Sequence, residues 1–205
     1  MLQKILVWFI GFSPFTKRWF WKKWYNVFAD RAKNSDFKFM NYGFDENGFF
    51  PDLKTEDKQE RYPIQLYHHV ASQTDLSGKV VLEVGSGRGG GASYVSRYLR
   101  PSSVLGVDIS ESAVELCNSI HAVDNLSFTV GDSEDLPFDA GSFDVVLNVE
   151  SSHCYGSVDQ FLKEVNRVLK PGGHFLWCDL RPPGNINDTY SRFEKAGFNI
   201  VQKRD

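Results

Sequence analysis

Cysteine is scarce in this sequence, the apolar runs are short, and the charge is nearly balanced. Three cysteines without CxxC spacing favour neither a disulfide framework nor a metal site, so a reducing, cytoplasmic location is expected. The apolar run from Ile5 to Phe12 has eight residues, whereas a membrane-spanning helix needs roughly 20, and no small-residue cleavage site follows it. A formal net charge of −3 provides no overall basic field, so no nucleic-acid partner is expected.

The length of 205 residues allows one ordinary domain and a short appendage. The appendage is residues 1–33, which hold seven basic residues against one acidic residue and four of the five tryptophans. Phe20, Trp24 and Phe28 recur at helical spacing with basic residues between them, which predicts an amphipathic helix. This helix either lies in a membrane interface as a peripheral contact or packs on the domain as a lid.

Residues 34–77 are expected to connect this helix to the domain. The stretch 34–60 is polar and contains glycine and proline, which is typical of a loop. Pro63 suits the first turn of a lid helix that continues to about Asp75.

Residues 78–205 alternate between short strands and helices. This pattern predicts an α/β fold, with a doubly wound, mostly parallel sheet covered on both faces. Strands are expected at residues 79–84, 103–107, 126–130, 143–149, 174–178 and 198–202. Helices are expected at residues 90–99, 111–122 and 158–170, and a further helix ends near Gly197. Ser112 with Glu115, and Ser157 with Gln160, are spaced as capping boxes.

A glycine-rich turn follows the first strand. In VVLEVGSGRGGG at residues 80–91, Gly85, Gly87 and Gly90 match the GxGxxG pattern of dinucleotide-binding folds, so a nicotinamide-dependent oxidoreductase is one hypothesis. Glu83 precedes the first glycine, and its charge disfavours a pyrophosphate there. A carboxylate at this position suits the ammonium and sulfonium groups of S-adenosylmethionine. Its alternative role is to hold the glycine turn by hydrogen bonds.

Two further acidic residues follow neighbouring strands at the same edge of the predicted sheet. Asp108 ends the second strand, where a carboxylate accepts hydrogen bonds from the hydroxyls of a ribose. Asp132 follows the third strand and either accepts from the amino group of an adenine or is an ordinary turn residue. With the glycine turn, these residues predict a nucleoside site at this edge.

Five short segments stand in order between Gly78 and Gln202. They are VLEVGSG at residues 81–87, GVD at 106–108, GD with LPF at 131–138, FDVV at 143–146 and LKPGG at 169–173. In this order the chain resembles the class I S-adenosylmethionine-dependent methyltransferases. The resemblance implies a Rossmann-like fold and S-adenosylmethionine as the cofactor. The cofactor contacts that it implies fall on Glu83, Gly85, Gly87, Asp108, Ile109, Asp132, Ser133 and Asn148.

Longer segments carry a narrower resemblance. They are QLYHH at 65–69, DLSGK at 75–79, GGGASY at 89–94, VLNVESSHCY at 146–155 and DLRP at 179–182. These segments are similar to the phthiotriol/phenolphthiotriol dimycocerosate methyltransferases, which O-methylate a hydroxyl on a long lipid. That family continues past the sixth strand into a segment that helps to form the acceptor pocket. This chain stops at Asp205, so a shortened C-terminus is expected.

Methyl transfer to an alcohol requires a group that takes the hydroxyl proton. Histidine suits this role near neutral pH, and His153, just beyond the fourth strand, is the first candidate. His69, or its neighbour His68, precedes the sheet and is a second candidate, for orienting the acceptor. Glu150 either polarises the acceptor or anchors its loop. Each histidine has a structural alternative as a hydrogen-bonded core residue.

The leading hypothesis is therefore an O-methyltransferase that acts on a hydroxyl of a lipid or other hydrophobic small molecule. The alternatives are a sterol-like C-methyltransferase, the nicotinamide-dependent oxidoreductase, and a catalytically silent S-adenosylmethionine-binding protein. These hypotheses differ in the ligand that they expect at the carboxyl ends of the strands.

Overall fold

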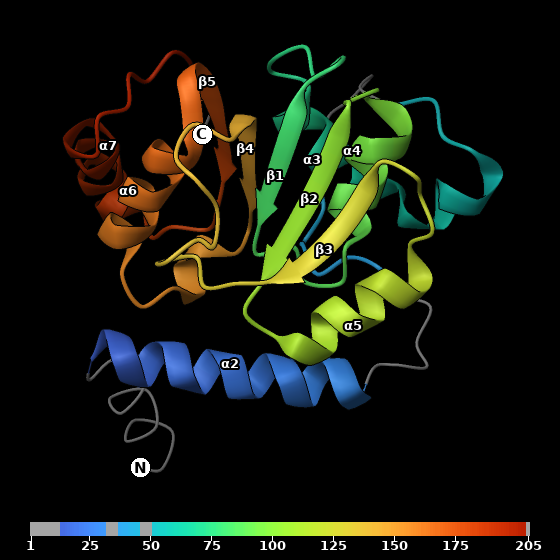
Figure 1. Ribbon diagram of the computed structural model, residues 1–205, viewed down its shortest axis with the longest axis horizontal. Coiled ribbons are helices and arrows are strands. Elements are labelled where there is room, and N and C mark those ends of the chain that lie inside the picture. The colour runs from blue at the N-terminus through green and yellow to red at the C-terminus, as the bar shows by residue number, and fades with distance from the viewer. Residues whose placement is uncertain (1–12, 32–36, 46–50, 204–205) are drawn as a thin grey trace.

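Five parallel strands form one sheet in the computed structural model, which describes residues 13–31, 37–45 and 51–203 (Figure 1). The order across the sheet is β3-β2-β1-β4-β5. The strands are β1 (Val80–Val84), β2 (Ser103–Asp108), β3 (Leu126–Val130), β4 (Phe143–Val149) and β5 (Leu169–Cys178). The predicted parallel sheet is confirmed, whereas the apolar run Ile5–Phe12 lies outside the described residues.

Burial explains the position of β1 at the centre. Val81 to Val84 are buried, as expected for a strand covered on both faces of a parallel sheet. Val81 pairs with Val104 of β2 on one side and Val145 of β4 on the other. The strand order reverses at β1, and such a switch point leaves a crevice at the carboxyl ends of the strands, where ligands bind.

Helices cover both faces of the sheet (Figure 1). They are α2 (Pro14–Arg31), α3 (Arg61–Ala71), α4 (Gly90–Tyr98), α5 (Glu111–Ile120), α6 (Val158–Val168) and α7 (Ile186–Lys195), with 3-10 helices η1 (Thr55–Glu60), η2 (Ser152–Cys154) and η3 (Pro183–Asn185). Ile64, Tyr94 and Cys117 belong to the buried cluster under α3, α4 and α5. Phe161 and Phe193 belong to a second cluster under α6 and α7, so the sheet is doubly wound as predicted.

Helix α2 crosses the carboxyl ends of the strands, below the sheet in Figure 1. Lys17 Nζ donates to the carbonyl oxygen of His153 at 2.8 Å. A Cβ on Gly156 would lie 2.6 Å from the carbonyl oxygen of Pro14, so the start of α2 is in close contact with the loop after η2. No helix within the described ranges is long and apolar enough to span a bilayer. Among the α2 side chains that the structure describes, the large apolar ones that are exposed are Phe15, Trp19, Trp24 and Val27.

Several predicted element ends need correction. The N-cap of α5 is Ser110, not Ser112, because Ser110 has an extended backbone and its side chain accepts from the N–H of Ala113 at 3.2 Å. Ser157 caps α6 as predicted. Helix α3 ends at Ala71 rather than near residue 75.

The predicted last strand at residues 198–202 is wrong: these residues form no strand in the described part of the chain. The N–H of Phe198 donates to the carbonyl oxygen of Phe193 at 3.1 Å, and its ring packs on Phe193 and Phe175. The apolar character of this segment therefore serves packing against α7 and β5. Strand β5 also begins earlier than predicted, at Leu169, which pairs with Phe143.

Candidate functional site

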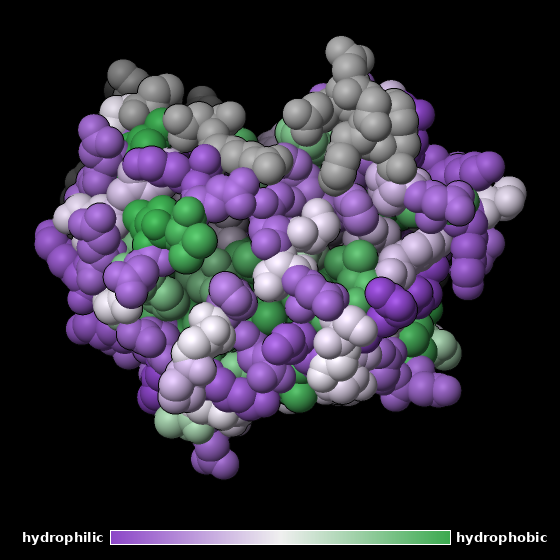
Figure 2. Space-filling view, turned by 90° about the horizontal axis from the view of Figure 1, so that it is seen from above, coloured by the Kyte–Doolittle hydropathy of each residue, from purple (hydrophilic) through white to green (hydrophobic). Residues whose placement is uncertain are grey.

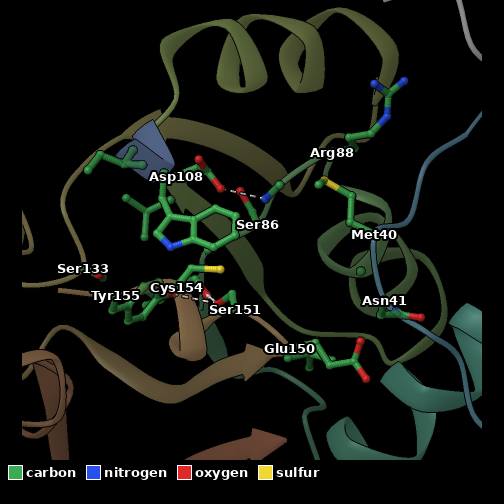
Figure 3. A pocket seen from close by; sticks show the side chains of 18 of the residues that line it. Met40, Asn41, Ser86, Arg88, Asp108, Ser133, Glu150, Ser151, Cys154 and Tyr155 are labelled. Carbon is green, nitrogen blue, oxygen red and sulfur yellow. Dashed lines mark hydrogen bonds between the residues drawn. The ribbon is translucent and has the colours of Figure 1, made fainter. Parts of the chain in front are cut away.

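A cleft of about 250 Å³ lies at the carboxyl ends of β1, β2 and β4 (Figure 3). Its walls come from α2, residues 38–42, the glycine-rich turn, the ends of β2 and β3, and the segment after β4. The predicted site residues that line it are Gly85, Gly87, Asp108, Ile109, Asp132, Ser133, Glu150 and His153. The structure thus brings most of the candidate cofactor and acceptor residues to one cavity.

The glycine-rich turn brings bare backbone to this cleft. Gly85 and Gly87 have φ angles of +76° and +53°, which residues with a side chain rarely adopt. A Cβ on Gly85 would lie 2.3 Å from Ser151 Oγ, and one on Gly91 would lie 1.9 Å from the ring of Tyr67. Conformation and space both exclude side chains here, so backbone N–H groups can approach a ligand closely.

Asp108 connects the end of β2 to the glycine turn. One carboxylate oxygen accepts from the N–H of Gly87 at 2.9 Å, and the other accepts from the N–H of Ser110 at 2.9 Å. Burial raises the pKa of this carboxyl, while the backbone hydrogen bonds lower it. Because a carboxylate has about four lone-pair sites, Asp108 can still accept from a ligand in the cleft (Figure 3).

Asp132 lies where α2 meets the end of β3. Its Oδ2 is 3.1 Å from Nη1 of Arg18, which is also 3.7 Å from Glu134 Oε2. Asp132 Oδ1 accepts from the N–H of Glu134 at 3.0 Å. An arginine of α2 therefore reaches the position predicted to accept from adenine, a contact that no local sequence pattern reveals.

Glu83 was predicted to contact the cofactor directly, but it lies behind the cleft wall and does not line the cleft. It is 1 % exposed, and Tyr67, which does line the cleft, donates to its Oε1 at 2.6 Å. Burial raises the pKa of Glu83 to about 8, although the hydrogen bond from Tyr67 opposes this shift. These contacts fit the alternative role, in which Glu83 holds the structure around the glycine turn.

Asn148 is also fully buried behind the wall rather than on it. Its Nδ2 lies 2.8 Å from the carbonyl oxygen of Val84, 2.7 Å from Ser151 Oγ and 2.9 Å from Tyr155 Oη. Ser151 and Tyr155 line the cleft (Figure 3). Asn148 therefore orients two wall residues that sequence reasoning missed.

His153 and Glu150 line the part of the cleft where the chain leaves β4. Nδ1 of His153 is 2.6 Å from Oδ1 of Asp179, and this hydrogen bond raises the pKa of His153 to about 10. Glu150 has a φ of +48°, an uncommon conformation for a non-glycine residue that is often found at functional sites. Its Oε2 accepts from the N–H of Tyr42 at 2.9 Å, and burial raises its pKa.

His69 does not line this cleft, so its predicted role at the acceptor lacks geometric support. Its ring packs against Phe44, with the ring centroids 4.4 Å apart. Nδ1 of the neighbouring His68 is 2.5 Å from the hydroxyl oxygen of Tyr94. The structural alternative fits both histidines. Within the described ranges, no three metal-ligating side chains come together.

Comparisons with known proteins agree with this geometry. Residues 82–177 match the family described as a methyltransferase domain. The phthiotriol/phenolphthiotriol dimycocerosates methyltransferase of Mycobacterium tuberculosis is 46 % identical over 175 residues, which cover 85 % of this chain and 65 % of that protein. The chain belongs to the S-adenosylmethionine-dependent methyltransferases.

The chain is also similar to the fatty-acid O-methyltransferase of Mycolicibacterium smegmatis, at 44 % identity over 181 residues, which cover 88 % of this chain and 66 % of that enzyme. The crystal structure of the cyclase SpnF has the same fold, with a TM-score of 0.69, 21 % identity, and coverage of 87 % of this chain and 70 % of that one. The chain therefore spans about two thirds of the length of the curated relatives described here.

The residues of the cleft fit S-adenosylmethionine, the cofactor that the family implies. Ser86 lines the cleft, and its buried Oγ has no hydrogen-bond partner within the described residues. This hydroxyl, the carboxylates of Asp108 and Asp132 and the bare backbone of the glycine turn provide partners for a nucleoside that also carries positive charge. Sequence reasoning missed the lining residues from α2 and from the segment between α2 and η1: Arg18, Trp21, Lys38, Phe39, Met40, Asn41 and Tyr42.

Proposed function

We propose that this chain transfers the methyl group of S-adenosylmethionine to a hydroxyl oxygen of a lipid or other hydrophobic small molecule. The observation that carries the proposal is that one and the same cleft contains the glycine turn and Asp108 together with His153 and Glu150. The names of two similar enzymes, which act on dimycocerosates and fatty acids, support a lipid acceptor.

In this proposal, the cofactor supplies an electrophilic methyl group. Asp108 accepts from the ribose hydroxyls, and Gly85 and Gly87 let the backbone approach. Ile109, Asp132 and Ser133 surround the adenine. Positioning accounts for most of the rate, because holding an acceptor oxygen in near-attack geometry supplies roughly 7–11 kcal/mol in favourable cases.

His153 takes the proton of the acceptor hydroxyl, and Glu150 is proposed to polarise that hydroxyl. Because its hydrogen bond to Asp179 raises the pKa of His153 to about 10, most of the imidazole is protonated at neutral pH. A reaction that needs the neutral ring therefore becomes faster as pH rises toward that value.

Calorimetric titration with S-adenosylmethionine tests the cofactor site. Asp108→Ala is expected to weaken binding about 10- to 100-fold, because a hydrogen bond to a charged group contributes about 1.5–3 kcal/mol. Asp188→Ala is the matched control, because Asp188 is an exposed carboxylate on α7. Equal affinity of wild type and Asp108→Ala would remove the proposed site.

The outer surface of α2 supports a peripheral membrane contact. Phe15, Trp19 and Trp24 are 67 %, 50 % and 54 % exposed, and Lys23 Nζ lies 5.1 Å from the centre of the Trp19 ring. Aromatic and basic side chains together favour the headgroup region of an anionic bilayer. By contrast, the face at the amino ends of the strands is mostly hydrophilic (Figure 2). The three cysteines form no disulfide bonds with one another, which supports a cytoplasmic location.

Flotation with anionic liposomes tests this contact. Replacing Phe15, Trp19 and Trp24 together by Ser is expected to abolish flotation without changing cofactor affinity. Val201→Ser is the control, because Val201 is 88 % exposed outside α2. Undiminished flotation of the triple variant would contradict the membrane contact.

A further inference from the structure

A buried carboxylate stands behind the imidazole of His153. Asp179 follows β5, and its side chain is fully buried, whereas the side chain of His153 is 36 % exposed and lines the cleft. Their atoms Oδ1 and Nδ1 are 2.6 Å apart. One face of the pair is therefore protein interior and the other is the cleft.

Further donors hold Asp179 in place. Ser152 Oγ donates to Oδ2 at 2.5 Å, and the N–H of Leu180 donates to Oδ1 at 2.8 Å. Nη2 of Arg181 lies 3.2 Å from Oδ2. Burial alone would raise the pKa of Asp179, but the hydrogen bonds from His153 and Ser152 lower it below its usual value. Asp179 is therefore an ionised carboxylate with a fixed orientation.

The donor Ser152 is itself fixed. Its Oγ accepts hydrogen bonds from Trp177 Nε1 at 3.0 Å and from Arg181 Nη2 at 2.8 Å. A buried polar network whose members are all hydrogen-bonded is rigid. The network thus fixes the orientation of Asp179, and Asp179 in turn limits the rotation of the His153 ring.

We propose that Asp179 is a positioning residue for His153, which it holds with Nδ1–H toward the interior and Nε2 toward the acceptor. A carboxylate that accepts from Nδ1–H stabilises the tautomer whose lone pair is on Nε2. This proposal rests on the proposed methyl transfer. In that transfer the acceptor oxygen would form its bond to the methyl carbon while the bond from that carbon to the sulfur of S-adenosylmethionine breaks, leaving the neutral thioether S-adenosylhomocysteine. The O–H bond of the acceptor would break at the same time, and its proton would pass to Nε2. The resulting imidazolium is stabilised by Asp179 and later releases the proton to water.

Other titratable groups also act on His153 or on Asp179. They come from α2, the end of β4, η2, the segment after η2, β5 and the loop after β5: Lys17, Glu150, Cys154, Tyr155, Cys178 and Arg181. The test must therefore isolate Asp179 from this background by changing it alone.

NMR titration of the His153 imidazole in the full chain provides that test without substrate or cofactor. The resonance is assigned by its loss in His153→Gln. Asp179→Asn is expected to lower the titration midpoint by about 1–3 units, because it removes an opposite charge at hydrogen-bond distance. Asp179→Glu is expected to keep the midpoint raised, and Asp188→Asn to leave it unchanged. An unchanged midpoint in folded Asp179→Asn would overturn the proposal.

A wild-type measurement covers the case in which Asp179→Asn does not fold. A downfield Nδ1 proton resonance of His153, slow to exchange at neutral pH, is expected for the protected hydrogen bond. Absence of this resonance would contradict the proposal.

Rate measurements separate this proposal from the proposed reaction. With a lipid alcohol as acceptor, Asp179→Asn is expected to lower the plateau value of kcat, reached above the pH midpoint, about 10²-fold or more and to shift that midpoint to lower pH. If the wild type transfers no methyl group but the NMR midpoint shifts, the proposed reaction fails and the orientation of His153 stands. If the wild type transfers the methyl group, and both kcat and its pH midpoint are the same in Asp179→Asn as in the wild type, the positioning role fails.

Discussion

The two ends of the cleft are built in different ways. At the cofactor end, the wall is one continuous stretch of backbone, from Gly85 to Gly91, beside carboxylates that follow neighbouring strands. At the acceptor end, side chains converge from α2, residues 38–42, η2 and the end of β4. Local backbone geometry determines the first end, and long-range packing determines the second. Substitutions at the first should therefore change cofactor affinity, and substitutions at the second should change turnover.

The largest effect is expected at the acceptor end. His153→Gln should lower kcat about 10²- to 10⁴-fold, the usual contribution of a positioned proton acceptor, with cofactor affinity unchanged. Steady-state rates and calorimetry measure the two quantities separately. An equal loss in both would mean that the two ends are not independent.

At the cofactor end, Gly85→Ala should lower cofactor affinity about tenfold or more, since overpacking costs about 1–3 kcal/mol and a Cβ would meet Ser151 Oγ at 2.3 Å. Gly141→Ala is the matched control, because Gly141 has a φ of +68° with nothing within 4 Å of its Cβ position. If both variants bind the cofactor equally well, the crowding at Gly85 has no role in cofactor binding.

The raised pKa of Glu83 makes the free energy of unfolding depend on pH. Its pKa is about 8 in the folded chain, against an ordinary value of 4.5, so between these pH values the folded state holds a proton that the unfolded state has lost. Stability from this group therefore falls as pH rises across that window and is level above it. Glu83→Gln should remove this loss.

Urea unfolding of both proteins at pH 5, 7 and 8.5 checks this expectation. The difference in unfolding free energy should move in favour of Glu83→Gln as pH rises. The fall in stability that comes from the raised pKa of His153 is common to both proteins and cancels in the difference. A difference that is independent of pH would contradict the raised pKa of Glu83.

The smallest effect is expected where α2 meets the cleft. The ion pair of Arg18 and Asp132 is partly exposed, with side chains 37 % and 28 % accessible, and such pairs contribute about 0–1 kcal/mol. Arg18→Gln should weaken cofactor binding less than about fivefold, and the difference should shrink at high salt. A loss as large as that of Asp108→Ala would make α2 an essential part of the cofactor site.

Local and long-range features of the cleft also differ in how far the sequence predicts them. The glycine turn and Asp108 were predictable, because strand ends and turn residues are signalled by adjacent residues. His153 was identified because it follows β4. Tyr67 beside Glu83, and Arg18 beside Asp132, depend on contacts between distant segments that no local pattern encodes.

The predicted last strand failed for a related reason. Phe198, Ile200 and Val201 give the segment the apolar composition of a strand. The segment does not pair with the edge strand β5, and the Phe198 ring packs on Phe193 and Phe175 instead. Tertiary packing outweighs local propensity at this point.

Transfer of an isotopically labelled methyl group tests the central claim most directly. The full chain is incubated with S-adenosylmethionine labelled on its methyl group and with a long-chain alcohol in anionic vesicles, beside Asp108→Ala and His153→Gln. The account predicts labelled methyl ether with the wild type and little with either variant. Tight cofactor binding by the wild type with no label on any lipid oxygen would contradict it.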